Sequence, residues 1–216
     1  MKPPSLHALR ILLADDHAVV RMGFRLLLEG AGAEVVGEAD CGEAAVQAYA
    51  QLSPDLLLMD VSMPGIGGLG ALERVRAHHP EARVLMLSAH DDTQIPARAL
   101  RSGASGYLSK RAHPDELLQA VAKVARGQRY LDPVIAPALA LAQLSGAEDP
   151  VAALTEKEFA VFLQLARGCS VSEIAASHSL SPSTVGTHLY HIKQKLEVSN
   201  AAEIALVAVR CGLIEV

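Results

Sequence analysis

Short apolar segments alternate with amphipathic segments five times between residues 9 and 125. Each apolar segment is too short for a helix, and in the residues that follow it the apolar positions recur at helical spacing. Parallel strands need crossover helices of this kind, so the alternation predicts an α/β fold, a doubly wound five-stranded parallel sheet with helices on both faces. The predicted strands are residues 9–14, 34–39, 56–59, 84–87 and 106–109.

The third predicted strand is the most constrained part of this pattern. An apolar run from Leu56 to Met59 leads directly into Asp60, and turn-forming proline and glycine residues follow. Such a run is typical of a strand that is buried on both faces. Asp60 then lies at the carboxyl end of the strand, which is where open parallel sheets bind ligands. A single aspartate at this point also fits a helix cap, so a chemical role depends on residues elsewhere in the chain.

The other predicted strands bring polar residues to the same edge of the sheet, because right-handed crossovers place all carboxyl ends together. Close carboxylates repel one another unless a cation joins them, and hard oxygen ligands suit Mg2+. A magnesium ion and an ammonium together can shield a phosphoryl group during its transfer. The residues at this edge are Asp15, Asp16, Asp60, Ser88 and Lys110.

This set of residues predicts a phosphoryl-transfer site in which Asp60 is the nucleophile and forms an acyl phosphate. Ser88 would donate a hydrogen bond to a phosphoryl oxygen, and Lys110 would pair with the phosphoryl group. Each residue also has a plainer interpretation: Ser88 as a strand-end cap, Lys110 as a solvated surface lysine, and Tyr107 as strand packing. The coincidence of the whole set at one edge favours the chemical interpretation.

Residues 10–126 resemble the receiver domain of bacterial two-component response regulators. The matching motifs are Asp15-Asp16, Met59-Asp60 followed by Met63-Pro64, Ser88-Ala89, and Tyr107-Leu108-Ser109-Lys110. Many receivers carry a cis proline after the lysine. Arg111 stands at that position here, where a cis bond would be costly.

The resemblance implies that a sensor histidine kinase phosphorylates Asp60, and that Ser88 and Tyr107 form a switch pair. In such a pair the serine moves toward the phosphoryl group and the tyrosine turns inward. The resemblance also implies a Mg2+ site made by Asp15, Asp16, Asp60 and the backbone carbonyl of Ser62.

Residues 154–216 are predicted to form a smaller all-α domain. Thr155-x-x-Glu158 and Ser170-x-x-Glu173 are capping boxes, and Asn200-x-x-Glu203 is a third candidate. Ser181-Pro182 starts a further helix. Four short helices, with a tight turn before a helix that carries exposed polar residues, favour a helix-turn-helix.

Residues 154–213 resemble the LuxR-type helix-turn-helix of the NarL/FixJ class. The matching stretches are Leu154-Thr155 with Glu158, Gly168-Cys169-Ser170 with Glu173-Ile174-Ala175, Thr184-Val185, Lys195-Leu196 and Gly212-Leu213. The resemblance implies that residues 181–196 enter the major groove. It assigns DNA contacts to Ser183, Thr184, Gly186, Thr187, Tyr190, Lys193 and Lys195, of which the two lysines would meet phosphates.

The small net charge of the predicted recognition helix limits the expected affinity for DNA. Within residues 181–199, Lys193 and Lys195 stand against Glu197, a net charge of only +1, so the non-specific affinity for DNA should be modest.

The last predicted helix, residues 200–211, has more apolar residues than one core contact needs. It therefore predicts a dimer face that includes Ile204 and Val207.

The predicted organisation is a receiver domain at residues 1–127, a linker at 128–153 and a helix-turn-helix domain at 154–216. Residues 136–144 are rich in alanine and leucine and predict a linker helix, which is also a candidate docking or dimer surface. No apolar run is long enough to span a bilayer, and residues 1–10 lack the core of a signal peptide. With three scattered cysteines, these features predict a cytoplasmic protein that has no membrane partner.

The sequence as a whole predicts a response regulator that is phosphorylated at Asp60, forms a homodimer when phosphorylated and binds double-stranded DNA. It would not be an enzyme apart from catalysing its own phosphoryl transfer and dephosphorylation. One alternative is a phosphatase of the haloacid-dehalogenase type, but those enzymes place a second aspartate two residues after the nucleophile, where Ser62 stands here. Another is a receiver whose second domain binds a protein rather than DNA.

Overall fold

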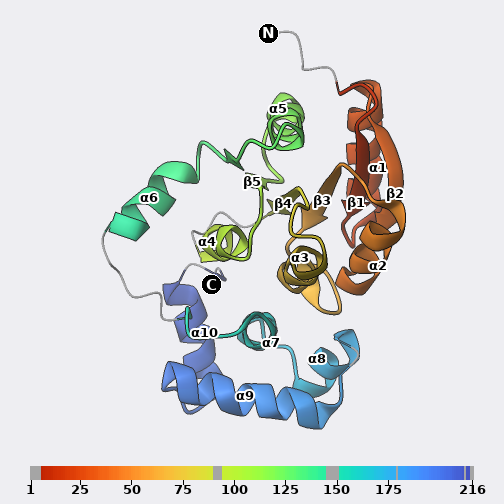
Figure 1. Ribbon diagram of the computed structural model, residues 1–216. Coiled ribbons are helices and arrows are strands. Elements are labelled where there is room, and N and C mark those ends of the chain that lie inside the picture. The colour runs from red at the N-terminus through yellow and green to blue at the C-terminus, as the bar shows by residue number, and fades with distance from the viewer. Residues whose placement is uncertain (1–5, 90–93, 145–150, 179, 212, 215–216) are drawn as a thin grey trace. The chain divides into compact units, whose positions relative to one another are not determined.

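The computed structural model describes residues 6–89, 94–144, 151–178, 180–211 and 213–214. The chain divides into two compact units, with the division between Pro137 and Ala138. The first unit holds a parallel sheet and its helices, and the second holds helices α7 to α10 (Figure 1).

The sheet of the first unit has parallel strands in the order β2-β1-β3-β4-β5-β6. The five predicted strands are all present, and their ends lie within one residue of the prediction. The prediction was wrong by one strand, because the two-residue strand β6 lies in the segment that was assigned to the linker. The strands are β1 (Arg10–Ala14), β2 (Glu34–Ala39), β3 (Leu56–Asp60), β4 (Val84–Ser88), β5 (Gly106–Ser109) and β6 (Tyr130–Leu131).

Helices alternate with these strands along the chain, as the sequence pattern predicts. Pro114 occupies the first turn of α5, and His113 before it caps the helix through a complete capping box with Glu116. The predicted linker helix is present as α6. The helices are α1 (Ala18–Gly30), α2 (Gly42–Leu52), α3 (Gly67–His78), α4 (Gln94–Arg101), α5 (Pro114–Ala125) and α6 (Ala136–Leu144).

Both faces of the sheet are covered, which explains why its strands are apolar at nearly every position. One core cluster packs Leu28 of α1 and Val121 of α5 against alternate strand residues such as Leu58. Leu57 and Met86 lie outside that cluster and are still fully buried, so the opposite face is covered as well. With both faces sealed, the edge formed by the strand ends is where buried polar groups can gather.

Beyond α6, which spans the division between the units, the helices of the second unit are α7 (Glu156–Ala166), α8 (Val171–Ser177), α9 (Pro182–Leu196) and α10 (Ala201–Arg210). The predicted capping boxes at Thr155 and Ser170 are both complete. Asn200 also caps its helix, because its side chain accepts a hydrogen bond from Glu203 N. This third predicted capping box is incomplete, because the backbone N–H that donates to the Glu203 carboxylate is that of Ser199 and not that of Asn200. Helices α8 and α9, joined by a short turn, form the predicted helix-turn-helix.

Candidate functional site

The sheet brings the predicted site residues together at its carboxyl edge. Asp60 is the last residue of β3 and Ser88 is the last residue of β4, while Asp15 directly follows β1 and Lys110 directly follows β5. Asp15, Asp60 and Ser88 are 3% exposed or less. The sequence prediction that these side chains converge is therefore confirmed by the geometry.

Lys110 links the two buried carboxylates directly. Its Nζ lies 2.6 Å from Asp15 Oδ2 and 2.8 Å from Asp60 Oδ2. Burial raises the pKa of Asp60 above its ordinary value, and the hydrogen bond from Lys110 opposes that rise. Burial alone would lower the pKa of Lys110, but the hydrogen bonds to Asp15 and Asp60 outweigh it and the pKa is raised. Lys110 is therefore held as a cation between the carboxylates.

The acidic residues also form a group that is suited to a divalent cation. Asp15, Asp16, His17 and Asp60 each offer a ligand atom, and these atoms lie within 4.8 Å of one another. Carboxylate oxygens are the ligands that Mg2+ prefers, so the donor set fits the predicted ion. His17 is an addition that the sequence reasoning missed, although it directly follows Asp15-Asp16: its Nδ1 lies 2.6 Å from Asp16 Oδ1.

The backbone after Asp60 is fixed by close packing. Ser62 donates its backbone N–H to the Asp60 carboxylate; a role for the Ser62 carbonyl stays a prediction. Gly68 N donates to Val61 O at 3.0 Å, and a Cβ on Gly68 would lie 1.9 Å from the Asp60 carbonyl oxygen. Only glycine at position 68 allows α3 to begin this close to the end of β3.

The segment that carries Tyr107 and Lys110 is equally well anchored. Tyr107 has no exposed surface, so its side chain lies inside the unit. Lys110 N donates to Ser88 O at 2.7 Å, and Arg111 N donates to Ser109 Oγ at 3.2 Å. The Lys110–Arg111 peptide bond is trans, consistent with the non-proline residue at position 111.

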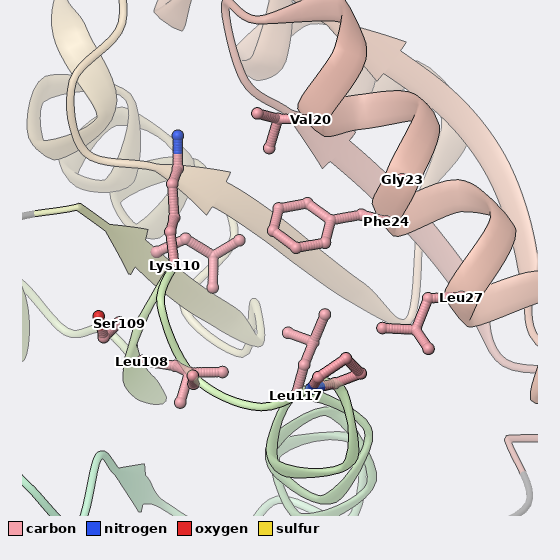
Figure 2. Close-up of a pocket in the computed structure, with 11 residues that line it drawn as sticks. Val20, Gly23, Phe24, Leu27, Leu108, Ser109, Lys110 and Leu117 are labelled. Atoms are coloured by element: carbon pink, nitrogen blue, oxygen red, sulfur yellow. The ribbon is translucent and has the colours of Figure 1, made fainter.

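A pocket of about 400 Å³ lies between α1 and α5, next to this site (Figure 2). Its walls are mainly apolar and include Phe24, Leu27 and Leu117. In Figure 2 the ammonium of Lys110 points away from Leu117. Among the described residues that line this pocket, Lys110 is the only charged one, whereas its ammonium lies against Asp15 and Asp60, so the phosphoryl chemistry belongs to the acidic edge.

In the second unit, α9 presents most of the predicted DNA-contact residues to solvent. Val185 and Ile192 are fully buried and fix the orientation of the helix. Gly186 and Lys193 are half-buried, and Tyr190 is 62% exposed. The exposed members of the predicted set are Ser183, Thr184, Thr187, Tyr190 and Lys195.

Lys195 is also used inside the unit, which the sequence reasoning missed. Its Nζ lies 2.6 Å from Oε2 of Glu158, the capping-box residue of α7, and Glu158 is only 4% exposed. Burial would raise the pKa of Glu158, but the hydrogen bonds from Lys195 and Thr155 outweigh it and hold the pKa below its ordinary value. A phosphate contact by Lys195 stays a prediction, and it would compete with this ion pair.

The two residues predicted for a dimer face differ in exposure. Ile204 has no exposed surface and belongs to the core of its unit, whereas Val207 is half-buried. Leu206, which lies between them on α10, is 60% exposed. Of the predicted pair, only Val207 therefore has surface that is available to a second copy.

Comparison with known proteins agrees with both units. Residues 11–122 match the response regulator receiver domain, and residues 152–208 match the bacterial regulatory proteins of the luxR family. The chain therefore belongs to the two-component response regulators that combine a receiver domain with a LuxR-type DNA-binding domain.

Relatives extend this match over almost the whole chain. Response regulator UvrY of Escherichia coli is 41% identical over 208 residues, which cover 95% of each chain. Response regulator GacA of Pseudomonas aeruginosa is 40% identical over 210 residues, which cover 96% of this chain and 98% of the relative. The structure of RcsB from Salmonella enterica, bound to promoter rprA in the presence of the phosphomimetic BeF3-, matches with a TM-score of 0.67 and 26% identity over 93% of this chain and 98% of that one.

Among the residues that the structure describes, no helix combines the length and the apolar character that crossing a lipid bilayer requires.

Proposed function

We propose that this response regulator is switched by phosphorylation of Asp60, which accepts the phosphoryl group of a sensor histidine kinase. The observation that carries the proposal is the lysine bridge at the sheet edge, with Lys110 Nζ within 2.8 Å of Asp15 and Asp60. A buried carboxylate beside an ammonium and a second acidic residue has the parts needed to accept a phosphoryl group and to neutralise its oxygens.

Each side chain has a definite part in the transfer. An oxygen of Asp60 forms the new P–O bond as the donor's P–N bond to histidine breaks. Lys110 and the Ser88 hydroxyl then hold the phosphoryl oxygens, and Tyr107 occupies the inward position of the switch pair. Asp15, Asp16, Asp60 and the Ser62 carbonyl hold Mg2+, which when bound supplies positive charge against the phosphoryl oxygens. The chain promotes this transfer to itself and its later hydrolysis, with no separate substrate.

The phosphorylated chain acts on DNA as a homodimer in the cytoplasm. The exposed polar face of α9 and its half-buried Lys193 support entry into the major groove. The related RcsB is described as bound to promoter DNA with a phosphomimetic, which supports the same use of the second unit here. Exposed Leu206 and half-buried Val207 on α10 support contact between two copies.

The proposal is tested by phosphorylating the purified chain with radiolabelled acetyl phosphate and Mg2+. Wild type should gain a label that hydroxylamine releases, because hydroxylamine cleaves acyl phosphates. Asp60→Asn should gain essentially none. Asp115→Asn, which neutralises a side chain that is 60% exposed on α5, serves as the matched control and should label like wild type. Full labelling of Asp60→Asn would show that the nucleophile is another residue.

A further inference from the structure

A buried aspartate, Asp132, directly follows the short strand β6 and is not among the residues described so far for the phosphorylation site. Asp132 is 3% exposed. Its carboxylate accepts two backbone hydrogen bonds, from Ser109 N to Oδ2 at 3.0 Å and from Val134 N to Oδ1 at 2.8 Å. Ser109 is the residue directly before Lys110, so one carboxylate oxygen holds the strand end from which Lys110 reaches the site.

The Asp132 carboxylate takes the place of the backbone carbonyl that a continued β6 would offer to Ser109 N. Asp132 N still donates to Tyr107 O at 2.9 Å, which continues the β5–β6 pairing by one residue. The chain then turns away, and the Asp132 carbonyl accepts from Ile135 N and Ala136 N at the start of α6. Because its own carbonyl is used by that turn, the side chain satisfies the next N–H of β5.

This arrangement anchors the Lys110 end of β5 from both sides. Toward β4, Lys110 N donates to Ser88 O, and toward β6, Ser109 N donates to Asp132. The close approach of β6 is specified by Gly106, where a Cβ would lie 2.9 Å from the Tyr130 carbonyl oxygen. Asp132 is thus built into the edge of the sheet and is not a surface residue near it.

We propose that Asp132 is a positioning residue for Lys110 and that it ties the Lys110 end of β5 to the start of α6. Its Oδ2 fixes the backbone that aims Lys110 at Asp60, and its Oδ1 fixes the turn that leads into the linker helix. A change in β5 that follows phosphorylation therefore moves the first residues of α6. This inference rests on the proposed function, since it assigns Asp132 to the same phosphorylation site.

Asp132→Asn separates the two hydrogen bonds. An asparagine has one acceptor oxygen, so one of the two bonds is lost. We expect the bond from Val134 N to remain, because asparagine side chains readily accept from the backbone N–H two residues on, and the NH2 group then faces Ser109 N. We expect phosphorylation by saturating acetyl phosphate to slow on the order of tenfold, since small errors in placement cost this much or more. Mg2+ affinity, measured by isothermal titration calorimetry, should not weaken, because the carboxylates of the site lie at the carboxyl ends of β1 and β3.

Asp115→Asn is again the control and should change neither quantity. A variant that phosphorylates at the wild-type rate would overturn the positioning role, and so would a loss of phosphorylation accompanied by an equal loss of Mg2+ affinity. If wild type itself gains no hydroxylamine-labile label, the proposed function has failed, which is a distinct result.

Amide hydrogen exchange of the wild-type chain, resolved by NMR, tests the link without any variant. Beryllofluoride with Mg2+ should change the exchange rates of Ser109, Val134 and Ala136 together. A change at Ser109 and Lys110 with none at Val134 and Ala136 would overturn the link to α6.

Discussion

Lys110 places one ammonium between two carboxylates that have almost no contact with water. Without it, Asp15 and Asp60 would repel each other at the buried edge of the sheet. The ammonium lies within 2.8 Å of both, and its raised pKa reflects those two hydrogen bonds prevailing over burial. The same charge that stabilises the resting site is thus already in place to meet the oxygens of an incoming phosphoryl group.

The backbone of Asp60 leaves no room for a side chain at position 68. In Gly68→Ala the new Cβ would meet the Asp60 carbonyl oxygen at 1.9 Å, so the end of β3 or the start of α3 must move. We expect a loss of about 1–3 kcal/mol or more in the free energy of unfolding, as for other overpacked sites. We also expect slower labelling by acetyl phosphate. Urea denaturation followed by circular dichroism measures the first effect.

Gly23→Ala is the matched control for that substitution. Gly23 lies inside α1, and apart from its chain neighbours and the backbone of its own helix, no described atom comes within 4 Å of a Cβ built there. Alanine in a helix interior should raise the free energy of unfolding by about 0.5–1 kcal/mol. If Gly68→Ala were as stable as wild type and labelled normally, the close approach at Asp60 would not matter to the site.

At the scale of elements, the sequence was most informative where a pattern is local and repeated. Strands β1 to β5 were found from apolar runs bounded by turn formers, and their carboxyl ends gave the site because all parallel strands point the same way. Strand β6 has only Tyr130 and Leu131, with no alternation to detect, and exists because Gly106 lets it approach β5. Its pairing depends on residues 24 apart in the chain, which a local pattern does not reveal.

The second unit illustrates the same limit. The two capping boxes that are complete, at Thr155 and Ser170, join residues three apart and were predicted correctly. The ion pair between Glu158 and Lys195 joins α7 to α9 across 37 residues and was not foreseen. The resemblance to the LuxR-type helix-turn-helix gave the expectation that Lys195 contacts a phosphate. Only the fold reveals that a buried carboxylate already holds its ammonium.

Glu158→Gln tests how much the ion pair between Glu158 and Lys195 contributes to the free energy of unfolding. The pKa of Glu158 is lowered in the folded chain, so the ionised form favours folding. Its contribution is therefore present above the pKa of an unfolded glutamate and is lost as the pH falls through the folded value. We expect the variant to lose about 1–3 kcal/mol at neutral pH, because a buried hydrogen-bonded charge is removed. The difference from wild type should shrink in acid, as measured by urea denaturation across the pH range.

Glu173→Gln provides the control for that measurement. Glu173 closes the equivalent capping box of α8 and is exposed, and the described contacts of its carboxylate are with Ser170. The control variant should lose less stability than Glu158→Gln. Equal losses in the two variants would mean that the capping box, and not Lys195, accounts for the effect of Glu158.

At the scale of the whole molecule, charge restrains how the chain can use DNA. The net charge is −5, so long-range attraction to phosphates is weak and has to come from a few placed residues. Within α9 these are Lys193 and Lys195, and Lys195 is held by Glu158. Specific binding would then depend on the polar side chains of α9 and on pairing two copies, rather than on a broad basic surface.

The salt dependence of DNA binding gives the corresponding prediction. The slope of log affinity against log salt is close to −0.9 for each phosphate neutralised, so at most two lysines for each bound copy should give a shallow slope. Lys193→Ala should reduce its magnitude by about 1 for each bound copy. Fluorescence anisotropy of the full chain with a labelled non-specific duplex, titrated with salt, measures this slope.

Arg74→Ala distinguishes a local contact from the effect of overall charge. Arg74 is an exposed residue of α3 in the first unit, and its loss changes the net charge by the same amount as Lys193→Ala. If Lys193 meets a phosphate, only Lys193→Ala should flatten the slope. Equal flattening by both variants would mean that overall charge sets the salt dependence, and an unchanged slope in Lys193→Ala would remove Lys193 from the DNA interface.

Because Lys195 already has a partner in Glu158, Lys195→Ala should alter stability more than the slope.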